Sequence, residues 1–339
     1  MNLKEFALLL GLSQTTVSRA LRGYPEVKAA TRARIQQAAI EHGYHPNRSA
    51  VGLATGRAGA VGMVLGPLEF NPLTMEFLAG LGEQFEQEHI DLVISIVSSR
   101  AVELATYQRL AESRLVDAVV VHVPEWRDER IECLHELKLP FVLHGRSGSA
   151  NDDPYIDIDN FGAAKQATDH LLDLGHRRIA LINGLEGKTY SMHRDQGYQK
   201  ALSERRLAVD PKLIGYGAIT DEIGYRVMQG FLDRKNPPTA VFAGSMLSAL
   251  GAMRAIRDAG LSVGEDISLV AHDDVFPYLH AGKTTPALST TRSALKDAGH
   301  RVGEFVIQLL NGKNPKELQE VWPVEFILRE STKPKSHSK

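Results

Sequence analysis

The stretch LSQTTVSRAL at residues 12–21 predicts a short helix with one apolar face and one polar face. Val17, Ala20 and Leu21 recur at helical spacing, which is typical of a face that packs against other helices. The opposite face carries a continuous stripe of polar side chains, made up of Gln14, Thr15, Ser18, Arg19 and Arg22. Such a stripe is either an ordinary solvated helix face or a surface that contacts another molecule.

Two further helices are predicted around this stretch. Apolar side chains from Leu3 to Leu10 follow the i, i+3, i+4, i+7 pattern of one helix face, and Asn2 with Glu5 predicts a capping box at its start. Gly11 ends this helix, and a third helix is expected over residues 34–43. The order of a helix, a short turn and a second helix is the layout of a helix-turn-helix motif. The second helix of that motif enters the major groove of DNA. Glutamine and arginine can contact base edges there, and serine and threonine can reach bases or phosphates.

The charge of the chain is distributed unevenly. The 339 residues carry a net charge of −2, but residues 1–57 hold eight basic and three acidic side chains, a net +5. The remainder therefore holds 31 basic and 38 acidic side chains, a net −7. A small basic head on a larger acidic body is typical of a polyanion-binding module joined to another domain.

Composition excludes several classes of protein. The hydrophobic content of 43% and charged content of 24% are those of an ordinary globular chain, and no apolar run is long enough to span a membrane. The single cysteine, Cys133, excludes an intrachain disulfide and any multi-cysteine metal site. The histidines show no metal-ligand spacing, and neither a phosphate-binding loop nor a nucleophile elbow is complete. We therefore expect a cytoplasmic protein without a metal, a cofactor or a membrane partner.

Strand and helix patterns alternate from residue 60 onward. Apolar runs that predict strands occur at residues 60–65, 92–96, 118–123, 141–143, 155–158, 178–182, 240–243 and 267–271. Helical patterns lie between them at residues 75–85, 104–110, 163–174, 194–202 and 247–259. This alternation predicts an α/β fold with two doubly wound parallel-sheet lobes, because parallel sheets need helices on both faces. The polar tail, residues 331–339, is expected to be disordered.

Two motifs at matching distance carry a family resemblance. Residues 12–21 and the run GYHPNRSA at residues 43–50 closely resemble the head of the LacI/GalR family of bacterial transcription repressors, and the resemblance continues to about residue 330. It implies an all-α helix-turn-helix head at residues 1–46, a hinge at 47–57 and a two-lobed body of periplasmic-binding-protein type at 58–330. Lobe one is expected at about 58–159 and 291–323, and lobe two at about 160–290 and 324–330.

The resemblance also implies how the head and hinge contact DNA. In the family the hinge helix folds only on operator DNA, and its leucine wedges into a minor-groove step. That leucine corresponds by position to Leu53, which could instead be a linker residue packed on the body. Lys28 stands where the family commonly has a small hydroxyl residue that caps the third helix, and it can meet a phosphate instead. The residues expected at DNA are Leu3, Ser13, Gln14, Thr15, Thr16, Ser18, Arg19, Arg22, Asn47, Ala50 and Leu53.

For the body, the resemblance implies a small-molecule effector, most often a sugar, in the cleft between the lobes. The Arg-x-x-Gly pattern at residues 194–197 supplies Arg194 as a hydrogen-bond donor, and the strand end before Asp273 supplies an acceptor carboxylate. The alternatives are a surface helix residue for Arg194 and a turn residue for Asp273. The cleft wall is expected to include Lys188, Tyr190, Phe161 and Ser245, with Phe161 as a stacking face.

Two departures bear on the identity of the effector. Many family members have Asn-Asp where this chain has Gly244-Ser245, which predicts extra room and a bulkier effector such as an oligosaccharide. The run HDDVFPYL at residues 272–279 resembles the regulators of α-glucoside operons. We therefore expect a mono- or disaccharide as the effector.

Together these patterns predict a sequence-specific transcription regulator rather than an enzyme. A homodimer would place two heads on the half-sites of a pseudo-palindrome, and a sugar would release it from the operator. Two other classes share the bilobed body. A sugar-binding transport component would have no use for a basic helix-turn-helix head, and a sugar-acting enzyme would need an acid–base pair near the cleft.

Overall fold

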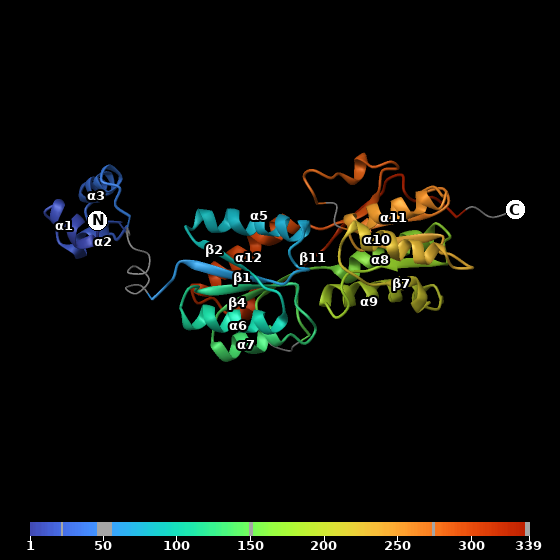
Figure 1. The fold of residues 1–339 in the computed structure, drawn as a ribbon, viewed down its shortest axis with the longest axis horizontal. Helices are drawn as coiled ribbons and strands as arrows, with labels where there is room; N and C mark the ends of the chain where they lie inside the picture. The colour runs from blue at the N-terminus through green and yellow to red at the C-terminus, as the bar shows by residue number, and fades with distance from the viewer. Residues whose placement is uncertain (22, 46–55, 149–151, 273–274, 336–339) are drawn as a thin grey trace. The chain divides into compact units, whose positions relative to one another are not determined.

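The computed structural model describes residues 1–21, 23–45, 56–148, 152–272 and 275–335 (Figure 1). The chain divides into two compact units, Met1–Gly59 and Ala60–Lys339. The predicted hinge residues Asn47, Ala50 and Leu53 lie outside the described residues, as do Arg22 and Asp273.

The described part of the first unit contains the three helices predicted for the head, α1 (Leu3–Leu9), α2 (Gln14–Leu21) and α3 (Ala29–Glu41). Asn2 and Glu5 form the predicted capping box at the start of α1. The turn between α1 and α2 contains Gly11 at φ +65°, a conformation that side chains with a Cβ rarely adopt. The buried core includes Phe6, whose ring stacks on that of Tyr44 with centroids 4.2 Å apart.

The second unit begins with a parallel sheet in the order β11-β5-β4-β3-β1-β2. Its strands are β1 (Ala60–Leu65), β2 (Asp91–Ile96), β3 (Ala118–His122), β4 (Phe141–His144), β5 (Tyr155–Ile158) and β11 (Gln319–Trp322). The helices of this lobe are α5 (Pro72–Gln87), α6 (Arg100–Glu112), α7 (Glu129–Leu137) and α12 (Leu295–Leu310), and Figure 1 shows them on both faces of the sheet. Helices α5 and α12 approach closely, because a Cβ at Gly80 would lie 1.9 Å from the Lys296 carbonyl oxygen.

The other lobe contains a second sheet, in the order β12-β10-β9-β8-β6-β7. Its strands are β6 (Ile179–Ile182), β7 (Ile214–Gly215), β8 (Ala240–Ala243), β9 (Ser268–His272), β10 (Ser289–Arg292) and β12 (Glu325–Ile327), of which β12 runs antiparallel to β10. Helices α8 (Asn160–Asp173), α9 (Thr189–Glu204), α10 (Asp221–Leu232) and α11 (Met246–Asp258) cover it. Short 3₁₀ turns lie at Pro211–Leu213, Ala281–Lys283 and Pro315–Glu317.

The chain passes between the two lobes after β5, after β10 and after β11. Each lobe is therefore built from segments that are distant in sequence. Each parallel sheet presents the carboxyl ends of its parallel strands at one edge, where ligands bind in open α/β folds.

The expected disorder of residues 331–339 is wrong for the part that the structure describes. Ser331 and Thr332 are buried, and Ser331 Oγ donates to the Leu269 carbonyl at 2.6 Å and accepts from the Ser289 amide at 2.8 Å. The Lys335 amide donates to the Leu174 carbonyl at 2.9 Å. Polar composition suggested a free tail, but these hydrogen bonds fix residues 331–335 along β9, β10 and α8.

Candidate functional site

The polar stripe of α2 faces solvent. Gln14, Thr15 and Arg19 are exposed and Ser18 is half-buried, whereas Val17 and Ala20 are fully buried in the head core. The amphipathic pattern therefore places the polar side of the second helix on the surface, as a groove-reading helix requires.

Ser13 and Thr16 fix the start of α2. The Thr16 amide donates to Ser13 Oγ at 3.1 Å, and the two hydroxyl oxygens lie 2.8 Å apart. Leu3 is half-buried and packs against the head core, so its side chain contributes to the fold of the head. Lys28 precedes α3 and is exposed, and it makes no side-chain cap because an ammonium group cannot accept a hydrogen bond.

A cavity lies between the two lobes of the second unit, at the carboxyl ends of the strands. One side comes from the segments that follow β1, β3, β4 and β5, and the other comes from the start of α9 and the end of β9. Three predicted effector residues line it: Lys188, Tyr190 and Arg194. Its wall also contains Glu69, Asp157 and Asn160, together with a group of histidines.

Arg194 is buried on α9 and held on two sides. Its Nε donates to Asn160 Oδ1 at 2.8 Å, and its Nη1 donates to the Gly244 carbonyl at 2.7 Å. Its guanidinium carbon lies 4.9 Å from the centre of the Tyr190 ring. The guanidinium is thus set in one orientation beside the cavity, which favours recognition of a ligand of fixed geometry.

The structure corrects the prediction of extra room at Gly244 and Ser245. A Cβ at Gly244 would lie 3.0 Å from Arg194 Nη1 and 3.1 Å from the Ile182 carbonyl oxygen, so the guanidinium occupies the space that glycine leaves. Ser245 is fully buried and caps α11, where its Oγ accepts from the Ser248 amide at 3.0 Å. It lies outside the residues that line the cavity.

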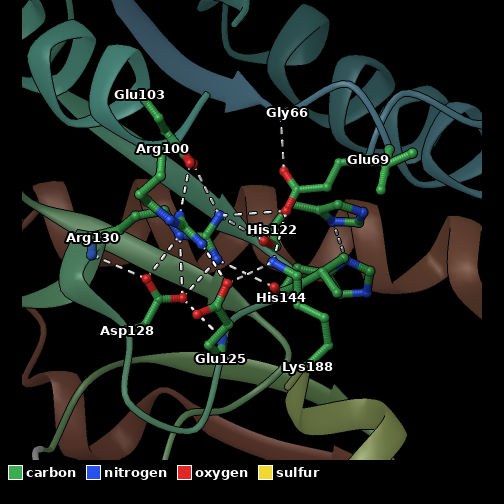
Figure 2. Close-up of polar contacts among 12 residues, drawn as sticks. Gly66, Glu69, Arg100, Glu103, His122, Glu125, Asp128, Arg130, His144 and Lys188 are labelled. Carbon is green, nitrogen blue, oxygen red and sulfur yellow. Dashed lines mark hydrogen bonds and ion pairs between the residues drawn. The ribbon is translucent and has the colours of Figure 1, made fainter. Parts of the chain in front are cut away.

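Lys188 crosses from one lobe to the other. Its Nζ lies 3.1 Å from Glu69 Oε1 and 3.2 Å from Glu125 Oε1, both on the opposite lobe (Figure 2). The neighbouring Thr189 amide donates to the Pro124 carbonyl at 3.1 Å, again across the cleft. These contacts make Lys188 an inter-lobe residue as well as a cavity residue, which the sequence did not predict.

The glutamates that meet Lys188 belong to a buried charge network (Figure 2). Arg130 is fully buried and lies 2.7 Å from Asp128, 3.1 Å from Glu103 and 3.8 Å from Glu69. Burial raises the pKa of Asp128, but the hydrogen bonds and the charge of Arg130, together with backbone hydrogen bonds from Glu125 and Arg130, outweigh burial and leave that pKa below its ordinary value. The network therefore fixes the position of Glu69 at the cavity wall.

Two histidines extend the polar wall. His122 Nδ1 and His144 Nδ1 are 2.8 Å apart, and Thr74 Oγ1 lies 3.2 Å from His122 Nε2. The Phe77 ring stacks on His144 with centroids 4.0 Å apart. Burial, together with the charges of Arg130 and Lys188, lowers the pKa of His122 to about 3, so its ring is neutral and can both donate and accept.

Several buried polar atoms around the cavity make no hydrogen bond within the described residues. They are Thr189 Oγ1, Asp157 Oδ2, which forms an ion pair with Arg146 Nε at 2.8 Å, and Ser191 Oγ, which belongs to α9 outside the cavity lining. Asp157 and Thr189 both line the cavity, and both are almost completely buried. A buried hydroxyl left without a hydrogen bond costs about 1–3 kcal/mol, so Thr189 Oγ1 points to a polar ligand that completes it.

The remaining predicted residues lie apart or outside the description. Phe161 lines a second, neighbouring hollow and not the main cavity. Asp273 follows His272, which does line the cavity, but Asp273 itself is outside the described residues. Sequence reasoning missed the histidine pair, Asp157 and Glu69, because each comes from a different strand end.

The comparisons with known proteins agree with both parts of this architecture. Residues 2–47 match the family "Bacterial regulatory proteins, lacI family", and residues 168–332 match "Periplasmic binding protein-like domain". The chain is 49% identical over 337 residues to the HTH-type transcriptional regulator AglR of Rhizobium meliloti (strain 1021), covering 98% of this chain and 94% of that protein. The chain belongs to the lacI family.

Solved structures of lacI-family regulators share the whole fold. A transcriptional regulator CelR–cellobiose complex is 29% identical, with a TM-score of 0.74 over 98% of this chain and 99% of that chain. The lac repressor dimer bound to operator and the anti-inducer ONPF is 25% identical, with a TM-score of 0.85 over 98% and 99% of the two chains. As a lacI-family regulator, this chain controls transcription through its helix-turn-helix head.

The described part of this lacI-family chain contains no helix that is long and apolar enough to cross a lipid bilayer. The same residues contain no group of three or more histidine, cysteine, aspartate or glutamate side chains placed to hold a metal ion.

Proposed function

We propose that the protein represses sugar-utilisation genes as a cytoplasmic homodimer and leaves its operator when a small sugar, in the first instance an α-glucoside, fills the cleft. The observation that carries this proposal is the set of buried polar atoms at the cavity, in which Arg194 is held in one orientation, Thr189 Oγ1 makes no hydrogen bond within the described residues, and Asp157 is ion-paired with Arg146. Sugar hydroxyls both donate and accept, so one ring can complete several of these atoms. The cellobiose complex of CelR and the resemblance of residues 272–279 to α-glucoside regulators support the same ligand class.

In this proposal Arg194 is the main donor to the sugar, oriented by Asn160 and Gly244. Asp273 is the proposed acceptor from the strand end that follows β9. Thr189, through its hydroxyl, and Asp157, through the carboxylate that also pairs with Arg146, complete the ring of polar groups. Tyr190 lines the cavity and offers an aromatic edge, and its oxygen accepts from the Leu185 amide at 3.0 Å.

The head is proposed to read DNA through α2. Arg19 and Gln14 contact base edges, while Thr15, Thr16, Ser13 and Ser18 reach bases or phosphates. Asn47, Ala50 and Leu53 are proposed to form the hinge contacts in the minor groove. No catalytic role is proposed for any residue, and the relatives are named as transcription regulators.

Effector binding is coupled to DNA only if the sugar binds the two lobe arrangements with different affinity. Lys188 gives the structure a means of coupling, because it lines the cavity and also pairs with Glu69 and Glu125 of the other lobe. A sugar that competes for Lys188 or for Glu69 changes the inter-lobe contacts directly. The changed lobe arrangement then acts on the hinge.

A thermal-shift screen of the purified chain against mono- and disaccharides tests the ligand class. Ligand at about 100 times Kd stabilises the folded state by roughly 2.7 kcal/mol, a shift that is easily measured. We expect stabilisation by α-linked disaccharides. Stabilisation by nucleobases or amino acids alone would overturn the sugar assignment while leaving the family unchanged.

A further inference from the structure

A second hollow adjoins the main cavity and spans the same two lobes. Trp126, Arg146 and Gly148 of lobe one line one side of it. Phe161, His193 and Gln196, from α8 and α9 of lobe two, line the other. None of these residues lines the main cavity, so the hollow is a separate space.

Asp157 connects the two spaces. It lines the main cavity, and its Oδ2 lies 2.8 Å from Arg146 Nε and 3.9 Å from His193 Nδ1, both of which belong to residues of the second hollow. Phe161 follows directly after Asn160, which holds Arg194 at the main cavity. Asp157 therefore stands at the boundary between the two spaces, with its carboxylate paired to Arg146 on the side of the second hollow.

The second hollow offers an aromatic surface. The Trp126 indole lies against Gly148, because a Cβ at Gly148 would be 2.1 Å from Trp126 Cε2. The Gly148 amide also donates to the Trp126 carbonyl at 2.8 Å, which fixes this loop pairing. Trp126 nevertheless remains 44% exposed, so a large part of the ring is left to contact a ligand.

The hollow also offers buried polar atoms. His193 is only 7% exposed, and its Nδ1 makes no hydrogen bond within the described residues. Arg146 lies beside it, with its Nε 2.8 Å from Asp157 Oδ2 in an ion pair and its side chain 32% exposed. Arg146 and Asp157 offset each other in charge, which favours a neutral ligand that both donates and accepts.

We infer that this second hollow is a subsite for a second sugar ring, which stacks on Trp126 and hydrogen-bonds to His193 and Arg146. The inference deepens the proposed function and rests on it: the first ring sits beside Arg194, and the effector is an oligosaccharide of at least two units. An aromatic face with a few fixed polar groups is the usual composition of such a site. The room for a larger effector thus lies at Trp126 and not at Gly244.

Isothermal titration calorimetry of the full chain tests this assignment with paired probes. Each disaccharide, beginning with maltose, is compared with the methyl glycoside of its single unit, beginning with methyl α-D-glucopyranoside. We expect Trp126→Ala to weaken binding of the disaccharide at least about tenfold, the loss of one good aromatic contact, and to change the one-ring probe less than about twofold. Gly148→Ala, which forces the indole to move, should have the same selective effect. Trp322→Phe, an aromatic substitution outside both spaces, is the matched control.

A fluorescence readout covers the case in which Trp126→Ala does not fold. Trp126 and Trp322 are the two tryptophans of the chain, so Trp322→Phe leaves Trp126 as the sole reporter. The disaccharide should change its emission and the one-ring probe should not. The subsite alone would be overturned if Trp126→Ala bound the disaccharide as tightly as the wild-type chain does. It would also be overturned if no bound disaccharide changed the emission of Trp126. Failure of every sugar pair to bind the wild-type chain would overturn the proposed function, and the subsite with it.

Discussion

At the scale of single residues, Arg194 joins the scaffold of lobe two to the proposed ligand. Arg194→Ala removes a guanidinium that is held by Asn160 and by the Gly244 carbonyl. Charge-assisted hydrogen bonds contribute roughly 1.5 kcal/mol or more each. Losing two such hydrogen bonds from the guanidinium to the sugar should therefore lower sugar affinity about 100-fold. Calorimetric titration measures this loss. Arg205→Ala, at the exposed end of the same helix, is the matched control and should bind sugar normally.

Arg194→Ala should leave operator binding intact, because the head is a separate compact unit. A variant that binds sugar as well as the wild-type chain would remove Arg194 from the site.

Two basic residues of the head should affect DNA binding in different ways. Arg19 is exposed on α2, whereas Lys28 precedes α3 without capping it. Arg19→Ala should cost about 1–3 kcal/mol on the preferred site and relax base preference, because arginine reads base edges. Lys28→Ala should weaken binding to all duplexes equally and reduce the salt dependence. Fluorescence anisotropy on a specific and a random duplex distinguishes these two effects. An equal loss of affinity for both duplexes in Arg19→Ala would contradict a contact between Arg19 and a base.

Asp157 should make stability depend on pH. Burial, opposed by the nearby Arg146, raises the pKa of Asp157 to about 7, whereas an aspartate in an unfolded chain has a pKa of about 3.9. Between these values the folded state holds a proton that the unfolded state has released, so this group makes stability fall as pH rises from about 4 to about 7. The free energy of unfolding of Asp157→Asn minus that of the wild type should therefore rise between about pH 4 and about pH 7. Chemical denaturation at several pH values measures the difference.

His193 titrates in an overlapping range with the opposite slope. Burial lowers its pKa to about 4, so its contribution to stability is lost as pH falls from about 6.5 to about 4. Because His193 Nδ1 lies 3.9 Å from Asp157 Oδ2, the same comparison in a His193→Gln background separates the two groups. A difference that is constant across the interval would show that Asp157 has an ordinary pKa.

At the scale of elements, the start of α9 connects the two lobes. Lys188→Met removes both cross-cleft ion pairs while it keeps most of the side-chain volume. We expect the Thr189 amide, which donates to Pro124 on the other lobe, to exchange its hydrogen about tenfold faster, because exchange reports local opening. Hydrogen-exchange mass spectrometry of the segment around Thr189 measures this. The control is Lys200→Met, which removes an exposed ion pair within the same helix. Unchanged hydrogen exchange in Lys188→Met would show that the ion pairs of Lys188 do not hold the lobes together.

The elements also show what the sequence could predict. Buried strands such as β1, β5 and β8 are found at their predicted positions, because short apolar runs bounded by turns are a strong signal. Helices α10 and α12 were not predicted, although their apolar residues follow helical spacing. Both contain glycines at close contacts, and a Cβ at Gly224 would lie 2.1 Å from the Ser248 carbonyl oxygen. Glycine has low helix propensity, but α5, α9 and α11 were predicted and carry glycines at equally close contacts, so glycine content alone does not explain why α10 and α12 were missed.

The candidate site was predictable only in part, because some of its residues are close in sequence and others meet only in the folded chain. Lys188, Tyr190 and Arg194 lie within one short segment that carries a family pattern, and the structure brings them to one cavity. His122 and His144 end β3 and β4, Asp157 lies one residue before the end of β5, and no local pattern joins them. Arg130 and its carboxylates, which position Glu69, likewise meet only in the folded chain.

At the scale of the whole molecule, the proposed function joins a DNA-reading head to a sugar-binding body in one chain. The charge asymmetry, the exposed polar face of α2 and the polar cavity between the lobes each have a function in that scheme. The scheme requires that occupation of the cavity changes the affinity of the head for DNA, and linkage requires the reverse effect as well.

The most direct test of this coupling is the fluorescence anisotropy of a labelled pseudo-palindromic duplex, selected from random DNA by the full-length chain, during titration with maltose and other α-linked disaccharides. We predict that one of these sugars releases the duplex, and that the same sugar at the same concentration does not release it from Arg194→Ala. A duplex that stays bound at concentrations of sugar that saturate the cavity would contradict the central claim.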